Sequence, residues 1–269
     1  MSLYEHIRNL GLGSLLLVIA RALYAFVGAI EKAILMDVFY NNATPAEVQT
    51  SLSIAIGLSI VALVLFLYGT RLMKKSSEAI GSIITDLSGL ATGYKLFFRG
   101  IIGTFIFAIA LAGVVLSASD IEAVAGIALT LGGLLVIFVI IFFVGLLLIG
   151  TRTKNLTMLG YNTVGPSYLI LLGAILIFFS PMLSGALLLI GFLRLGVTLY
   201  FSQAPPADVV TRIAEELEAE MEKEGFVNLM QFASQRGYPI RFVIEAAFGL
   251  AEKKGYKIAN GMLVKGAVM

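Results

Sequence analysis

The chain has 269 residues, a net charge of +2, 59% hydrophobic residues and only 13% charged residues. Soluble proteins carry about 25% charged residues, so this chain has too few polar side chains to cover its apolar surface in water. The composition therefore excludes a disordered chain, a disulfide scaffold (there is no Cys) and an ordinary soluble enzyme, and it indicates an integral membrane protein.

Five apolar runs reach the roughly 20 residues that a helix needs to cross a hydrocarbon layer about 30 Å thick. They are Leu10–Ile30, Leu52–Leu72, Leu96–Leu116, Ala123–Ile149 and Met182–Phe201. A sixth run, Pro166–Phe179, is shorter and forms a hairpin with the fifth, either as two full spans or as a re-entrant pair. We therefore expect an all-α polytopic membrane protein of about six transmembrane helices in residues 1–203.

The segment Ser76–Ala91 joins the second and third spans. Its Ile80, Ile83, Ile84 and Leu87 recur at helical spacing, and Ser77 is available as an N-cap. The pattern fits an amphipathic helix in the lipid headgroup region. It fits equally well a segment that packs beneath the bundle.

Basic residues indicate the orientation of the spans, because cytoplasmic flanks carry an excess of Lys and Arg. One set of flanks contains Arg8, Arg71, Lys74, Lys75, Lys95, Arg99, Arg152 and Lys154. The opposite flanks contain Asp37, Glu47, Asp120 and Glu122. We therefore expect a multi-pass protein of the cell membrane with both termini in the cytoplasm.

The N-terminal region carries two processing signals to weigh. Arg8, the apolar run and Ala20-Arg21-Ala22 together resemble a cleavable signal peptide. Because an even number of spans requires this helix, we interpret it as a retained first span. Asn42, on the predicted outer loop, fits an N-glycosylation acceptor, although Pro45 follows its Thr44.

Arg21 lies near the centre of the first span, where a charge costs at least about 2.5–3.5 kcal/mol. One hypothesis is that Arg21 lines a pore or a site for anions. The alternative is an arginine that bonds backbone carbonyls or hydroxyls between packed helices. Arg194, in the last span, is a second anion candidate, but it lies close enough to Phe201 for its side chain to reach the interface.

Pairs of small residues four positions apart occur in most spans and allow helices to approach closely. They are Ala25/Ala29, Ser53/Gly57, Ala108/Ala112 and Ala128/Gly132. The sequence leaves open whether these contacts lie within one chain or between copies. We expect a homo-oligomer.

Residues 204–269 form a charged tail with 8 Lys/Arg and 9 Asp/Glu. A helix capped by Asp208 and stopped by Gly225 precedes two further helices, Phe226–Arg236 and Pro239–Lys254. Tyr256–Ala259 and Met262–Lys265 flank Asn260-Gly261, a strong hairpin signal. This order of helices and hairpin resembles a winged-helix module.

The winged-helix-like part has a modest excess of basic residues. These are Arg236, Arg241, Lys253, Lys254, Lys257 and Lys265. They would form a nucleic-acid interface or a docking face for a cytoplasmic protein. The acidic helix before them would repel DNA or cover the basic face, so nucleic acid is the less favoured partner.

Catalytic chemistry has little support. The single His is His6, there is no thiol, and no motif of a metalloprotease, a phosphate loop or a serine hydrolase is present. We expect no enzyme, no catalytic residue, no metal site and no cofactor.

The segment Leu159-Gly160-Tyr161-Asn162, with the apolar helices from Leu172 to Phe192, resembles uncharacterised multi-span membrane families of archaea. The resemblance implies an archaeal source and no functional residue. The expected function is an oligomeric channel or transport-like scaffold for small ions or anions, with a cytoplasmic docking or assembly module. The alternatives are a membrane-tethered DNA-binding regulator and a structural subunit without transport.

Overall fold

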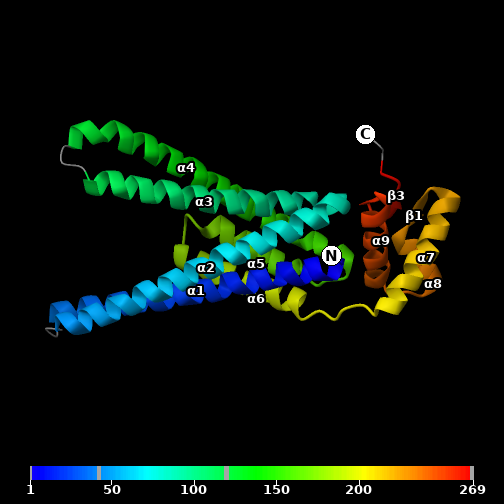
Figure 1. Cartoon of the computed structure of the whole chain (residues 1–269), viewed down its shortest axis with the longest axis horizontal. Coiled ribbons are helices and arrows are strands. Elements are labelled where there is room, and N and C mark those ends of the chain that lie inside the picture. Colours follow the sequence, from blue (N-terminus) through cyan, green and yellow to red (C-terminus); the bar gives the residue numbers. More distant parts are fainter. Residues whose placement is uncertain (1, 41–43, 118–120, 267–269) are drawn as a thin grey trace.

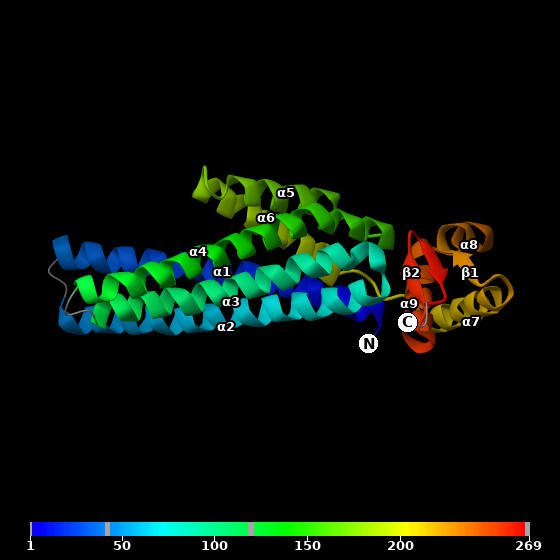
Figure 2. The same ribbon diagram turned by 90° about the horizontal axis from the view of Figure 1, so that it is seen from above.

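The computed structural model describes residues 2–40, 44–117 and 121–266, which form a long helical bundle with a small module at one end (Figures 1 and 2). Asn42, the predicted glycosylation acceptor, lies outside these residues. We call the end of the bundle next to the module the module end, and the end with the α1–α2 and α3–α4 connections the distal end. The bundle helices are α1 (Leu3–Tyr40), α2 (Pro45–Ile83), α3 (Ser88–Ser117), α4 (Ile121–Arg152), α5 (Val164–Leu176) and α6 (Pro181–Tyr200).

The described residues contain five helices that are long and apolar enough to cross a membrane: α1, α2, α3, α4 and α6. They correspond to the five apolar runs of the sequence, and α1 and α2 extend well beyond their runs at both ends. The 38 residues of α1 reach about 57 Å, nearly twice the thickness of a hydrocarbon layer. The chain therefore has the architecture of a multi-span membrane protein.

The α5–α6 hairpin is shorter than the other two hairpins. With 20 residues, α6 reaches about 30 Å, whereas the 13 residues of α5 reach only about 20 Å. The turn between them is strongly exposed and apolar, with Phe179 80% and Met182 90% accessible. Helix α6 has the length of a full span, whereas α5 is too short for one. The lengths therefore do not support the alternative of two full spans.

The six helices form a closed ring. Each helix packs against the next one along the chain, and α6 returns to pack against α1. Near the module end the helices are in close contact: a Cβ on Gly13 would lie only 2.6 Å from the carbonyl oxygen of Gly69 in α2. Towards the distal end the α1–α2 and α3–α4 pairs diverge as two arms (Figure 1).

The structure corrects the expectation of a separate amphipathic helix after the second span. Helix α2 continues to Ile83, so Ser77 is an interior residue whose hydroxyl donates to the carbonyl of Lys74. A short 3-10 turn, Thr85–Leu87, then leads into α3. Ile84 is buried and pairs with Ile258 of the module, which agrees with the alternative of packing beneath the bundle.

The module consists of three helices and a three-stranded antiparallel sheet in the order β1-β3-β2. Its core is formed by buried apolar side chains of α7, α9 and the strands, such as Leu217, Phe248 and Leu263. Its elements are α7 (Ala207–Glu224), β1 (Phe226–Asn228), α8 (Leu229–Arg236), α9 (Ile240–Lys254), β2 (Lys257–Ala259) and β3 (Met262–Val264). The residues between Tyr200 and Ala207 form no helix, and the predicted boundary at 203/204 falls among them.

Two details of the module differ from the predictions. Residues 226–228 form a strand, and the helix begins only at Leu229, where the Asn228 side chain accepts a hydrogen bond from the Gln231 backbone. Asp208 lies in the first turn of α7 and is not its cap, since the helix begins directly after Pro206. The hairpin at Asn260-Gly261 is confirmed, and both residues adopt the positive φ (49° and 72°) that a tight two-residue turn requires.

Candidate functional site

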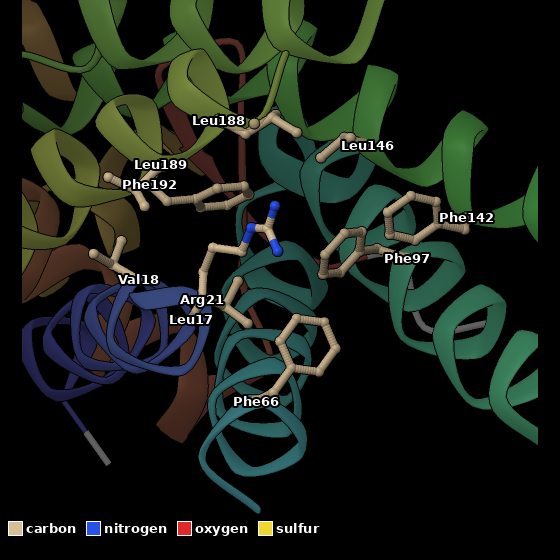
Figure 3. Close-up of a pocket in the computed structure, with 11 residues that line it drawn as sticks. Leu17, Val18, Arg21, Phe66, Phe97, Phe142, Leu146, Leu188, Leu189 and Phe192 are labelled. Carbon is tan, nitrogen blue, oxygen red and sulfur yellow. The ribbon is translucent and has the colours of Figure 1, made fainter. Parts of the chain in front are cut away.

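Arg21 lies in the middle of the apolar run of α1, about 16 Å along the helix from Leu10. Its side chain points away from α1 into a cavity of about 210 Å³ inside the helical ring (Figure 3). The cavity is lined by residues of five helices, and apart from Arg21 all of them are apolar. They are Leu17, Val18, Phe66, Phe97, Phe142, Leu146, Gly185, Leu188, Leu189 and Phe192.

A second, larger cavity of about 600 Å³ adjoins the first and shares Arg21, Phe66 and Phe142 with it. It lies between the two arms and is also predominantly apolar. Its remaining lining residues are Tyr24, Leu63, Leu67, Ile101, Thr104, Phe105, Ala108 and Val139. The Thr104 hydroxyl is buried and has no hydrogen-bond partner, so it is one polar atom of this cavity that a bound molecule could satisfy.

Within the part of the chain that the structure describes, the Arg21 guanidinium has no internal partner. Among the described residues, no carboxylate, hydroxyl or carbonyl group forms a hydrogen bond or an ion pair with it, and it stacks on no aromatic ring. This observation argues against the structural alternative, in which Arg21 bonds neighbouring helices. The rest of the cavity lining is apolar, and a charge at this depth of a membrane span costs several kcal/mol unless it has a counter-charge.

Arg194 belongs to a different part of the surface. It is exposed on α6, lines neither of the two cavities, and lies near Gly165 at the start of α5. The structure therefore does not bring the two anion candidates together.

The predicted small-residue pairs do not bring helices of this chain together. Five of their residues are exposed: Ala25, Ala29, Ser53, Ala108 and Ala112. Gly57 and Gly132 have no atom within 4 Å of the position that a Cβ would occupy. These residues are therefore not the places where the described helices pack most closely, and contact between copies stays a prediction.

A second charged group that the sequence did not single out lies at the junction of the module and the bundle. Glu245, in the middle of α9, is buried, and its carboxylate accepts a 2.9 Å hydrogen bond from the Tyr4 backbone N–H at the start of α1. Burial raises the pKa of Glu245 above its ordinary value, and the contact with the α1 backbone opposes this shift. In contrast to Arg21, this charge has specific partners, since the first N–H groups of a helix lack partners within the helix.

Two of the predicted basic residues pair with the acidic helix of the module. Arg236 lies 3.5 Å from Glu216 and 3.8 Å from Glu220, and Lys254 lies 2.6 Å from Glu218. These side chains are half-exposed, so the pairs contribute little to stability. Their position nevertheless shows that α7 neutralises part of the basic face.

Two more of these basic residues join the module to the bundle. Arg241 donates to the Gln203 carbonyl and lies 5.7 Å from the centre of the Tyr161 ring. Lys257 donates to the Ser82 carbonyl near the end of α2. Within the described part of the chain, only Lys253 and Lys265 of the predicted basic set have no bond or ion pair.

The β2–β3 hairpin also faces the bundle. The Asn260 backbone N–H donates to the Asp86 carboxylate at 2.8 Å, and the Thr85 hydroxyl donates to the Ile258 carbonyl at 3.1 Å. Helix α9 and the hairpin, the two elements by which a winged-helix module would read DNA, are therefore both engaged with the bundle.

Comparisons with protein-family models, with curated proteins and with solved structures find no match to this chain.

Proposed function

We propose that this multi-span membrane protein binds a negatively charged molecule within the bilayer, with Arg21 as the counter-ion. The observation that carries the proposal is the unpartnered Arg21 guanidinium, which faces two adjoining apolar cavities inside the helical ring. An arginine offers a planar, permanently charged set of donors that matches carboxylate and phosphate oxygens.

The Lys and Arg residues around the module end support a cytoplasmic location for the module. In this arrangement the module braces the bundle from the cytoplasmic side through Glu245 and the β2–β3 hairpin. Self-association stays a prediction, for which the exposed small-residue pairs on the arms provide the surface.

The test is an anion-dependent stabilisation of the purified protein in a neutral detergent. A ligand that carries a carboxylate or phosphate should raise the melting temperature of the wild type, and this shift should be lost in Arg21→Met. Arg194→Met is the matched control, because it removes the same charge from a position outside both cavities. An identical shift in wild type and Arg21→Met would refute an anion site at Arg21.

A pore for small anions is the second candidate, favoured by the closed ring of six helices around Arg21. It predicts a conductance in planar bilayers whose anion selectivity depends on Arg21. The apolar lining argues against a pore. An ion that lost its hydration shell there would gain only the interaction with one guanidinium.

The other two roles receive less support. A DNA-binding regulator would need α9 and the β2–β3 hairpin to be free, and both contact the bundle. A structural subunit would need Arg21 to be bonded within the bundle, and its guanidinium has no partner there among the described residues.

A further inference from the structure

We infer that the molecule bound at Arg21 is an amphiphile of the bilayer: a lipid with an anionic carboxylate or phosphate headgroup and a hydrocarbon chain. This inference rests on the proposed function and names the class of ligand. In this arrangement the headgroup lies at Arg21 and the chain fills the larger cavity between the arms.

The lining of the two cavities argues for a chain as well as a charge. A small inorganic anion would exchange its hydration shell for one guanidinium and a wall of Leu, Phe and Val side chains. Such an exchange is unfavourable, since a buried charge needs several hydrogen bonds. A lipid gains in addition the burial of its chain against the same apolar wall.

The two cavities also differ in size in the way that an amphiphile requires. Arg21 stands where they meet, so a headgroup there leaves the larger cavity of about 600 Å³ for the chain. The buried Thr104 hydroxyl and Tyr24 line the same larger cavity.

The larger cavity lies where the bundle is open to its surroundings. Its walls include Phe105, which is 46% accessible, and Ala108, which is exposed. The α1–α2 and α3–α4 arms diverge on this side of the ring (Figure 1). A lipid can therefore reach Arg21 from the bilayer between the arms without crossing water.

The experiment uses three kinds of probe with the full-length protein in a neutral maltoside detergent. Oleate and oleoyl lysophosphatidic acid carry both charge and chain, methyl oleate carries the chain alone, and acetate and inorganic phosphate carry the charge alone. We expect concentration-dependent melting shifts with oleate, with lysophosphatidic acid or with both, and none with the other probes. Native mass spectrometry should show the bound amphiphile.

Two variants test the placement of the ligand. Arg21→Met should weaken binding of the amphiphile about 10- to 100-fold, the range expected for a charge-assisted hydrogen bond, and Arg194→Met should not. Ala108→Phe should also weaken it, because the new ring fills the chain cavity while Arg21 is retained. Ala108→Phe keeps the test decisive if Arg21→Met does not fold.

The negative outcomes separate the inference from the proposed function. An Arg21-dependent shift with acetate or phosphate as large as that with oleate would overturn the amphiphile and leave the anion site intact. Equal shifts with oleate and methyl oleate, unchanged in Arg21→Met, would overturn both. Binding of oleate that Ala108→Phe leaves unchanged would overturn the assignment of the chain to the larger cavity.

Discussion

The two halves of the helical bundle are built differently. In the half next to the module, glycines such as Gly13, Gly69 and Gly145 lie against the backbone of a neighbouring helix. In the distal half, Gly57 and Gly132 face open space, and large apolar side chains are exposed on the arms. The close glycine contacts therefore lie in the half where the ring is closed, whereas Gly57 and Gly132 make none.

Arg21 lies at the transition between these two halves. On the module side of it the helices are in contact, and on the distal side the arms separate and leave the larger cavity. A charged residue in the closed half would have been enclosed by protein, and one on the arms would have faced lipid. Arg21 is itself exposed, and at the transition it lines both cavities.

The largest effect should come from filling one of the close glycine contacts. Gly13→Leu places a side chain against the Gly69 carbonyl oxygen, and since backbone cannot move aside, we expect a loss of more than about 3 kcal/mol of stability or no folded protein. Gly57→Leu is the matched control and should change the stability by less than about 0.5 kcal/mol. Unfolding in mixed micelles measures both. A large loss in Gly57→Leu would show that the distal arms pack against another copy.

The second-largest effect is expected at Arg21, whose charge has no counter-charge among the described residues. Without ligand, Arg21→Met should raise the free energy of unfolding by about 2.5–3.5 kcal/mol, because it removes a charge from an apolar environment. Arg194→Met removes the same charge from a position outside both cavities and should change it by less than about 1 kcal/mol. Thermal unfolding in zwitterionic bicelles is the measurement. A strong destabilisation of Arg21→Met in the delipidated protein would indicate an internal partner for Arg21.

A smaller effect is expected at the junction with the module. Glu245→Ala leaves the Tyr4 N–H without its acceptor and should weaken the junction by about 1–3 kcal/mol. Glu245→Gln retains an acceptor oxygen and should stay close to the wild type. Hydrogen exchange at the first residues of α1 reports on this contact directly. Unchanged exchange in Glu245→Ala would mean that the apolar contacts alone hold the module.

The smallest effect is a pH dependence of the same junction. Burial raises the pKa of Glu245, with Arg241 opposing the shift and Glu5 adding to it. A raised folded-state pKa means that its contribution to stability is complete below the ordinary pKa of about 4.5 and is lost as the pH rises through the raised pKa. The stability of the wild type should thus fall with rising pH relative to Glu245→Gln. If the difference in unfolding free energy between the wild type and Glu245→Gln does not change with pH, the prediction is contradicted.

Local patterns predicted those parts of the fold that depend on local interactions. The apolar runs gave the candidate spans, and Asn260-Gly261 gave the hairpin, since its positive φ angles are a property of those two residues. Strand β1 was missed because only pairing with β3 stabilises it: Phe226 lies opposite Val264, far along the chain. The end of α2 was missed because burial of Ile84 against the module decides it.

The candidate site was predictable only in part for the same reason. A charge within an apolar run identifies Arg21 from the sequence alone. The packing of α2, α3 and α4 decides the rest. It determines that the guanidinium lacks a partner among the described residues and that Thr104 and Phe142 line the same cavity. Glu245 carried no signal at all, since a single Glu on an amphipathic helix is usually exposed.

Helix α2 runs without interruption from the distal tip, past the cavity, to the module. Phe66 on this helix lines both cavities, and Ile84 directly after its last turn pairs with Ile258 of the β2–β3 hairpin. Because Phe66 and the end of α2 belong to one uninterrupted helix, a displacement of this helix at the cavity would also reach Ile84 and the hairpin paired with it. A molecule that moves α2 at the cavity would therefore also act on the sheet of the module.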